Sequence, residues 1–170
     1  MLEIISALKP FFEDNYRRIN IREYARMQKV SPPTASRILS SLCSRSILKR
    51  EIDKRYIYYY ADKDSGLFID LSRIFWKIRL KKSGLLDYIA AEAINPLVIL
   101  FGSLSKAEVK RDSDIDLAIF LSSNKEIVLT KFERKMKRII HPLVFAGREN
   151  VKNEALLNNI LNGYTLMGKW

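Results

Sequence analysis

The sequence predicts an α+β protein, with helices and a β-hairpin in residues 1–64, linker helices in 65–95 and a small mixed sheet flanked by helices in 96–170. Three observations support this class. Apolar residues recur at helical spacing in the first half of the chain, two strand-like runs surround a turn near residue 54, and two apolar runs of strand length follow residue 96.

The composition is that of a basic globular protein. The 170 residues are 48% hydrophobic, which argues against disorder as the main state, and their number suits one medium domain or two small ones. The 30 Lys and Arg outnumber the 19 Asp and Glu, giving a net charge of +11. This excess favours a polyanionic partner such as nucleic acid or nucleotide phosphate, with a merely basic surface as the alternative.

One cysteine, Cys43, and one histidine, His141, limit the kinds of site the chain can form. They are too few for an internal disulfide or a Cys/His zinc site. No signal peptide is expected, because the N-terminus lacks a basic segment followed by an apolar core. The most apolar stretch, residues 88–101, is too short and too often interrupted to span a bilayer. We therefore predict a cytoplasmic protein without a membrane partner.

Two short helices are predicted before the hairpin. The first spans residues 21–27, and Ser31 caps the second, which runs from Pro32 to about Leu42. The apolar face of the second helix consists of Ala35, Ile38, Leu39 and Leu42. The opposite face carries side chains that can hydrogen-bond phosphates or base edges, namely Thr34, Ser36, Arg37, Ser40 and Ser41.

The hairpin is predicted from strands at 47–52 and 56–61 around Asp53-Lys54-Arg55. Tyrosines alternate onto one face of its second strand, at Tyr56, Tyr58 and Tyr60. Base stacking is one interpretation of this row, and packing within the protein is the interpretation we favour.

This N-terminal zone resembles the winged helix-turn-helix regulators of bacteria and archaea. The resemblance rests on the order of helices and hairpin and on the pattern S-x-x-T-x-S-R-x-L from Ser31 to Leu39. It implies double-stranded DNA as a partner, with helix 32–42 in the major groove and the hairpin on the backbone. A helical hairpin that packs against another protein is the alternative. The expected DNA contacts are Thr34, Ser36, Arg37, Lys54 and Arg55.

A basic amphipathic helix is expected after residue 65, followed by a break at Ser83-Gly84 and a shorter helix over 85–94. The predicted apolar stripe comprises Leu67, Leu71, Ile74, Phe75, Ile78 and Leu80. Such a helix can lie on a membrane, but linking two domains or pairing with a second copy is the simpler interpretation. Because winged-helix proteins usually read two half-sites as dimers, we expect a homodimer.

The candidate site lies within residues 96–121. An apolar run over 96–101, typical of a central strand, ends in Gly102-Ser103. A loop then leads to Asp114-Ile115-Asp116, which opens a second apolar strand over 117–121. Alternate residues of a strand share a face, so the two carboxylates should project together with Cα atoms about 7 Å apart, while the isoleucine faces the core.

This arrangement suits a nucleoside triphosphate, such as ATP, with Mg²⁺. Magnesium takes oxygen ligands, often one or two carboxylates and the substrate phosphates. Gly102 allows close approach of the backbone to phosphate, and Ser103 adds an N–H and a hydroxyl at an expected helix start. Cations able to offset phosphate charge follow in the loop, namely Lys106, Lys110 and Arg111.

The segment LFGSLSKAEVKRDSDIDLAIF resembles the nucleotidyltransferase superfamily of the DNA polymerase beta type. It is most similar to the minimal branch, whose motif is G-S-x-x-x-G-x(n)-S-D-I-D-L, over roughly residues 94–145. The resemblance implies that Gly102 and Ser103, with Lys106 beside them, bind the triphosphate. It also implies that Asp114 and Asp116 are the catalytic carboxylates and hold the metal.

Two features depart from that branch. Ala107 and Glu108 occupy positions that are normally small or glycine, so the phosphate loop is altered. Active members carry a third carboxylate on the next strand, whereas the strand expected over 139–145 has none. His141 lies near that place and can act as a base, although capping of the strand is the favoured interpretation. Two acidic residues before this strand are not expected to reach a metal, namely Glu126 and Glu133.

Two functions of different class follow. The first is a magnesium-dependent nucleotidyltransferase that acts on a protein or nucleic-acid hydroxyl. By resemblance to minimal nucleotidyltransferases of toxin–antitoxin pairs, its partner would be a toxin-like protein. The second is an antitoxin-like transcriptional regulator whose impaired transferase domain only senses or binds a nucleotide. The winged helix and the missing carboxylate favour the second function, whereas the Gly-Ser and D-x-D motifs favour retained metal and nucleotide binding.

The C-terminal residues predict a helix over 153–162, with Gly163 as its stop. A short strand or a docking tail should follow at 164–167. The residues expected to face inward are Ala155, Leu156, Leu157 and Ile160.

Overall fold

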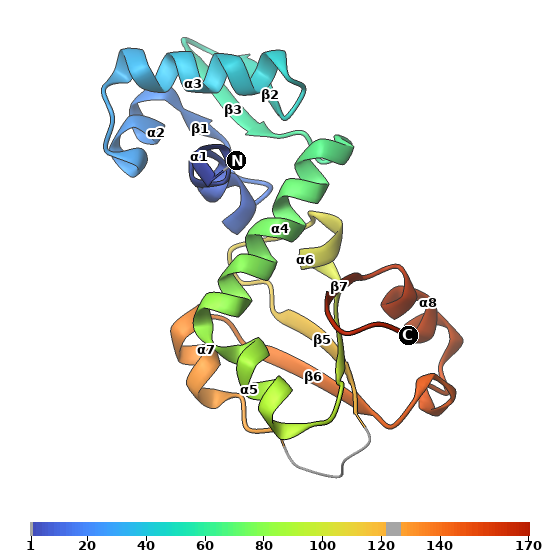
Figure 1. The fold of residues 1–170 in the computed structure, drawn as a ribbon. Coiled ribbons are helices and arrows are strands. Elements are labelled where there is room, and N and C mark those ends of the chain that lie inside the picture. Colours follow the sequence, from blue (N-terminus) through green and yellow to red (C-terminus); the bar gives the residue numbers. More distant parts are fainter. Residues whose placement is uncertain (1, 122–126) are drawn as a thin grey trace. The chain divides into compact units, whose positions relative to one another are not determined.

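The computed structural model describes residues 2–121 and 127–170 (Figure 1). The chain divides into two compact units. The first unit is Met1–Ser72 with Ala107–Arg111, and the second unit is Arg73–Lys106 with Asp112–Trp170. Helices and two separate sheets are present, so the predicted α+β class is confirmed at this level.

The first unit combines helices with a three-stranded antiparallel sheet of order β1-β3-β2. The predicted order of helices and hairpin is confirmed, and a short strand that the sequence did not indicate, β1, joins the sheet. The elements are α1 (Leu2–Glu13), β1 (Ile19–Asn20), α2 (Ile21–Gln28), α3 (Pro32–Ser44), β2 (Leu48–Asp53), β3 (Tyr56–Ala61) and the start of α4 (Gly66–Ser83).

Local hydrogen bonds explain where α2 and α3 begin. The Asn20 side chain accepts a hydrogen bond from the Glu23 amide at 3.0 Å, which caps α2. Ser31 caps α3 as predicted, accepting from the Thr34 amide at 3.3 Å. Between the two helices, Lys29 adopts a left-handed conformation with φ 55°, which ends α2 and turns the chain.

The tyrosine row of β3 lies outside the core but packs in part within the protein, since Tyr58 and Tyr60 are half-buried and the Arg18 guanidinium lies 4.9 Å from the centre of the Tyr58 ring. Tyr59 is the tyrosine of this strand that is buried, together with Ala61. Because side chains alternate along a strand, Tyr56, Tyr58 and Tyr60 occupy the opposite, outer face, where Tyr56 is 54% exposed. The sequence pattern alone does not indicate which face of the hairpin the helices cover.

The buried stripe of α4 differs from the predicted one. Its fully buried side chains recur every four residues at Phe68, Ser72, Trp76 and Leu80. Leu71 and Phe75 are also buried as predicted, but Leu67 is 47% exposed. The α4 helix ends at Ser83, and Gly84 follows with φ 85°, so the predicted break is confirmed.

The second unit is built on a four-stranded sheet of order β6-β5-β4-β7. Strands β4 (Leu97–Phe101) and β5 (Ile115–Phe120) are antiparallel, as are β4 and β7 (Tyr164–Met167), whereas β5 and β6 (Ile140–Phe145) are parallel. All of β4 is buried, as expected for a central strand. Of the two alternatives for residues 164–167, a short strand or a docking tail, the strand is present.

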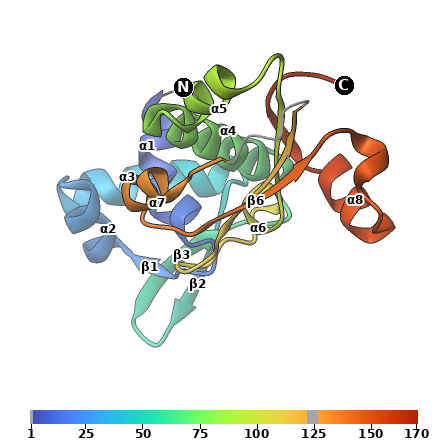
Figure 2. The same ribbon diagram turned by 90° about the horizontal axis from the view of Figure 1, so that it is seen from below.

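Helices cover both faces of this sheet (Figures 1 and 2). One face carries α5 (Leu85–Glu92), α7 (Thr130–Met136) and the second half of α4, and the other carries α8 (Glu154–Leu161). A short α6 (Ser103–Lys106) follows β4, and a 3-10 turn spans Arg148–Asn150. The core under α8 contains Leu97, Ile99, Phe101, Ala118, Phe120, Val151 and Ile160.

Helix α8 agrees with the sequence in its extent but only partly in its inward face. Ile160 is buried and Leu156 and Leu157 are half-buried, whereas Ala155 is exposed. After the helix, a Cβ on Gly163 would lie 2.6 Å from the Leu100 carbonyl oxygen. Gly163 therefore permits β7 to pair closely with β4.

Within the described ranges, none of the helices combines the length and the apolar character needed to cross a membrane.

Tyr24 offers a test of the first unit's packing. Its ring is buried and its hydroxyl donates to the Ala7 carbonyl at 2.9 Å. Tyr24→Phe should lower the free energy of unfolding by about 1 kcal/mol at neutral pH, because this hydrogen bond is lost while the ring remains. Burial also raises the pKa of Tyr24 from 10.0 to about 12. The unfolded chain therefore releases this proton first, and stability should fall as the pH rises from 10.0 to about 12.

Urea unfolding at neutral and alkaline pH measures both effects, with Tyr56→Phe at an exposed position of β3 as the matched control. Tyr24→Phe should lose part of the alkaline decrease, and Tyr56→Phe should retain it. An unchanged alkaline decrease in Tyr24→Phe would contradict the assignment.

Candidate active site

Two carboxylates meet at the start of β5. Asp114 directly precedes the strand, and Asp116 is its second residue, with the fully buried Ile115 between them as predicted. Asp116 pairs in register with Phe101 at the end of β4 and with His141 near the start of β6. The site therefore lies where three strand ends meet. Strand alternation places Asp116 on the same sheet face as Ala118 and Phe120, the face that carries α8.

Gly102 lies directly against Asp116. A Cβ at Gly102 would be 2.2 Å from Asp116 Oδ2, and the residue has φ 68°, a conformation that favours glycine. From the sequence, we expect this close approach to serve phosphate. The structure adds that the carboxylate itself occupies the space that a side chain would fill.

The turn after Gly102 is held by hydrogen bonds that the sequence did not reveal. The Gly102 carbonyl accepts from the Ser105 amide at 3.2 Å and from its hydroxyl at 2.9 Å. Arg73 Nε in turn donates to the Ser105 carbonyl at 2.8 Å. The predicted helix start at Ser103 is present, but α6 has four residues. Its peptide dipole is correspondingly small, so any anion binding here would depend on individual backbone N–H groups.

The three basic residues of the loop between β4 and β5 do not lie together. Lys106 Nζ donates to Asn159 Oδ1 of α8 at 2.8 Å, on the sheet face that carries the carboxylates. Lys110 and Arg111 belong instead to the first unit, where Lys110 Nζ lies 5.8 Å from the centre of the Tyr16 ring. Ala107 adopts φ 55° without being glycine, so the altered phosphate loop keeps a left-handed turn.

His141 faces the carboxylates, and the interpretation of it as a strand cap is wrong. Its Nε2 lies 3.1 Å from Asp114 Oδ2, and both side chains are partly exposed, His141 at 56% and Asp114 at 40%. The parallel register of β5 and β6 causes this contact, because it sets His141 beside Asp116. The sequence indicated His141 and its strand, but not the pairing of that strand with β5.

No carboxylate of β6 joins the pair, because the strand contains none. Glu133 Oε1 accepts a hydrogen bond from the Ile140 amide at 2.9 Å, which holds the start of β6. Glu126 lies outside the described residues. Arg138 donates to the Ser113 carbonyl, and its guanidinium lies 5.1 Å from the centre of the Trp76 ring. Arg138 thereby fixes the residue before Asp114, a role that the sequence did not indicate.

The electrostatics of the pair favour a bound cation. Burial raises the pKa of Asp116, the nearby His141 lowers it and Asp114 raises it. A divalent cation would relieve both the burial cost and the repulsion between the carboxylates. Among the described residues no group of three or more His, Cys, Asp or Glu is arranged to hold a metal. The donor set instead fits a magnesium ion that takes two carboxylates and completes its shell from phosphate and water.

The predicted DNA contacts lie in the first unit. Arg37 is exposed on α3, and Lys54 and Arg55 are exposed in the β2–β3 turn. Thr34 and Ser36 are half-buried, and the Thr34 hydroxyl is 2.9 Å from that of Ser31, so it takes part in the cap of α3.

The basic side chains of the first unit fall into two groups, those with and those without an ion pair. Arg17, Arg18 and Lys49 form ion pairs with carboxylates. Another set makes no ion pair within the described part of the chain: Arg22, Arg26, Lys29, Arg37, Arg45, Arg50, Lys54 and Arg55. These residues belong to α2, α3, β2 and the loops that follow them. Three members of this set are predicted DNA contacts, namely Arg37, Lys54 and Arg55.

The comparisons with known proteins concern the second unit. Residues 88–168 match the family model described as Polymerase beta, Nucleotidyltransferase. The matched range contains β4, both carboxylates, His141 and α8. The match supports the nucleotidyltransferase part of the predicted resemblance. The curated proteins yielded no match to this chain.

The raised pKa of Asp116 predicts a stability effect. Because the folded state disfavours ionised Asp116, its contribution to stability is greatest below the unfolded pKa of 3.8 and falls as the pH rises. In metal-free solution at neutral pH, Asp116→Asn should therefore raise the midpoint of thermal unfolding by about 1–3 °C. Near pH 3 the difference should shrink.

Differential scanning calorimetry with a chelator present measures this midpoint. Asp112→Asn, a change at an exposed neighbouring carboxylate, removes the same formal charge and should leave the midpoint nearly unchanged. A lower midpoint for Asp116→Asn at neutral pH would show that the carboxylate stabilises the apo fold.

Proposed function

We propose that the second unit binds a magnesium–nucleoside triphosphate and transfers its nucleotidyl group to a hydroxyl of a protein or nucleic acid. The observation that carries this proposal is the Gly102 backbone packed against Asp116, with Asp114 beside it, within residues that match a nucleotidyltransferase family. A chance D-x-D on a surface would not require a glycine with φ 68° against one of its carboxylates.

The residues take separate roles in this proposal. Asp114 and Asp116 hold the metal, the Gly102-Ser103 backbone meets the triphosphate, and Lys106 offsets phosphate charge by leaving Asn159. Bound Mg²⁺ supplies charge neutralisation and orientation of the triphosphate. The exposed side of the pair remains open for an acceptor hydroxyl, since Asp114 and His141 are both partly exposed.

A second function is favoured by one observation, the replacement of a carboxylate on β6 by His141. Its Nε2 is engaged by Asp114 in this structure, and β6 contains no Asp or Glu that could face the pair. The corresponding protein would be an antitoxin-like regulator that binds the nucleotide without turning it over.

We propose for the N-terminal region a winged helix that binds double-stranded DNA. The order α1-β1-α2-α3-β2-β3 and the sheet order β1-β3-β2 support it, as do the cations of α2, α3 and the hairpin turn that lack carboxylate partners. Residues 1–64 then form the DNA-binding domain, 65–95 the linker helices and 96–170 the transferase-like domain. The cytoplasmic location, the homodimer and the toxin-like partner protein belong to the same proposal.

Labelled ATP tests the second unit. With Mg²⁺ and ATP labelled at the α-phosphate, wild-type protein should retain the nucleotide in equilibrium dialysis, and Asp114→Asn and Asp116→Asn should each weaken retention at least about tenfold, since each removes a charged metal ligand. Asp112→Asn should bind as the wild type does.

The fate of the label separates the two functions. Label that becomes attached to a macromolecule, and does so only with both aspartates intact, supports the transferase. Retained ATP without attachment supports the regulator. Absence of retention in the wild type would refute nucleotide binding altogether.

DNA retention tests the first unit. In selection from random duplexes, wild-type protein should enrich a sequence, and Arg37→Ala should weaken binding to it by about 1–3 kcal/mol if the side chain contacts a base. Arg55→Ala should weaken all duplexes similarly and reduce the slope of affinity against salt by about one. Lys152→Ala, at an exposed position of the second unit, is the control. Equal binding by all three variants would contradict the assigned surface.

A further inference from the structure

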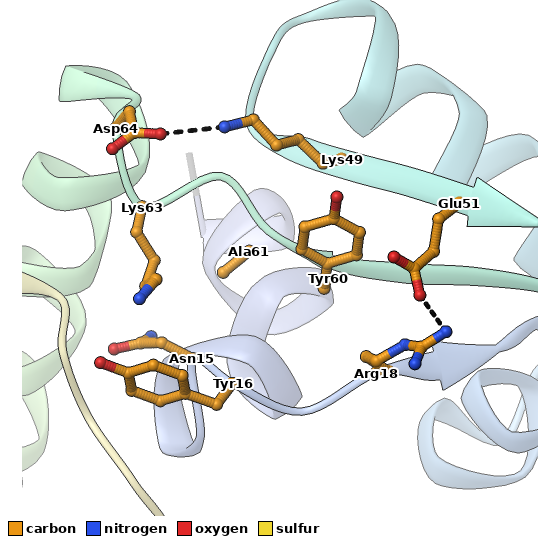
Figure 3. Close-up of a pocket in the computed structure, with 9 residues that line it drawn as sticks. All are labelled: Asn15, Tyr16, Arg18, Lys49, Glu51, Tyr60, Ala61, Lys63 and Asp64. Carbon is orange, nitrogen blue, oxygen red and sulfur yellow. Dashed lines mark hydrogen bonds and ion pairs between the residues drawn. The ribbon is translucent and has the colours of Figure 1, made fainter.

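A small pocket of the first unit is not used by either part of the proposed function (Figure 3). Its volume is about 280 Å³, near the lower limit for sites that hold small organic ligands. It lies beside the outer face of the three-stranded sheet, next to the turn that follows α1. Side chains from that turn, from β2 and β3 and from the loop after β3 line it.

Two phenol rings border this pocket. Tyr60 comes from the outer row of β3 and is half-buried, and Tyr16 follows α1 and is 48% exposed. Neither hydroxyl has a hydrogen-bond partner within the described ranges. The buried Asn15 holds Tyr16 in place, because its side chain donates to the Phe11 carbonyl at 2.6 Å and accepts from the Val109 amide at 2.6 Å. The rings therefore stand on a fixed backbone.

The carboxylates around the pocket are already occupied. Glu51 pairs with Arg18, as the dashed line in Figure 3 marks. Asp62 and Asp64 bind Lys49 Nζ at 2.7 and 3.0 Å, and these bonds, Asp62 first, raise the pKa of Lys49. The two acidic neighbours of residue 63 in the sequence are thus both directed to Lys49.

Lys63 is left without a carboxylate. Its Nζ lies 3.9 Å from the centre of the Tyr16 ring, and it makes no ion pair in the described part of the chain. A cation over an exposed ring gains less than a charged hydrogen bond to phosphate supplies. An anion entering the pocket would therefore draw Lys63 away from the ring and expose the ring face.

We propose that this pocket binds a single nucleotide, with the base against Tyr16 and Tyr60 and the phosphate on Lys63. A planar base uses the ring faces, and one phosphate uses the ammonium that no carboxylate offsets. A carboxylate ligand without a ring would leave the tyrosines unused, and an apolar ligand would leave Lys63 unpaired. The nucleotide is either free or part of a single strand, since both present the same base and phosphate.

The test uses AMP, titrated calorimetrically into the full chain carrying Asp116→Asn, with a chelator present. These conditions remove the metal-dependent site of the second unit, so its failure or success does not affect the result. We expect saturable binding with one AMP per chain. Tyr60→Leu and Lys63→Gln should each weaken it about tenfold, through lost stacking and a lost charged hydrogen bond.

Adenosine provides the decisive comparison. The parent should prefer AMP to adenosine about tenfold, and Lys63→Gln should bind both equally, because the phosphate has lost its partner. Two matched controls should bind as the parent does. Tyr56→Leu changes a residue on the same strand and face as Tyr60 but outside the pocket, and Lys9→Gln changes an exposed position of α1. The adenosine comparison needs only a surface lysine change, so it remains valid if Tyr60→Leu fails to fold.

Absence of saturable AMP binding, or an unchanged preference for AMP in Lys63→Gln, would overturn the proposal. A single-stranded oligo(dA) without a terminal phosphate distinguishes the two sources. Tighter binding of the oligonucleotide than of AMP, weakened by the same two variants, identifies a single strand. Binding of AMP alone identifies a free nucleotide.

Discussion

The contact between the Gly102 backbone and the Asp116 carboxylate is the constraint on which the candidate site depends. Antiparallel pairing of β4 and β5 sets Phe101 opposite Asp116, so the chain must leave β4 directly beside the carboxylate. No side chain fits between them, and the backbone turns with φ 68°. Asp116 is partly buried at this place, and burial raises its pKa. The backbone conformation at Gly102 and the electrostatics of Asp116 are therefore found at the same place. The turn favours glycine, and the carboxylate beside it is one that a bound cation would stabilise.

The rest of the second unit holds this contact from several directions. Arg73 and Ser105 fix the turn after Gly102, and Arg138 fixes Ser113. These bonds connect residues far apart in the sequence, 32 positions for Arg73 and Ser105 and 25 for Arg138 and Ser113. For this reason no local pattern indicated them. The buried strands are different, because their continuous apolar runs mark them at once.

The same distinction explains which predictions held. Caps, turns and strand runs are local, and Ser31, the break at Gly84 and the burial of Ile115 were all predicted correctly. The contact of His141 with Asp114 depends on a parallel register between β5 and β6, which a single sequence does not specify. The exposure of Tyr56 and of Leu67 depends on which surfaces other elements cover. Sequence patterns identified the residues of the candidate site. The pairing between strands that are distant in the sequence determines which of their side chains come into contact.

In the first unit, the positions of the carboxylates determine which basic side chains are paired and which are not. Glu51 and Asp53 pair with Arg18. Asp62 and Asp64 pair with Lys49. These acidic residues at or next to the sheet are therefore already in ion pairs. The helices α2 and α3 contribute one acidic residue, Glu23, which pairs with Arg17. Their arginines and the turn residues Lys54 and Arg55 consequently keep their full charge toward solvent. A polyanion would be attracted to that surface, whereas at the pocket beside the outer face of the sheet Lys63 is a cation without a carboxylate partner, which suits one phosphate next to two aromatic rings.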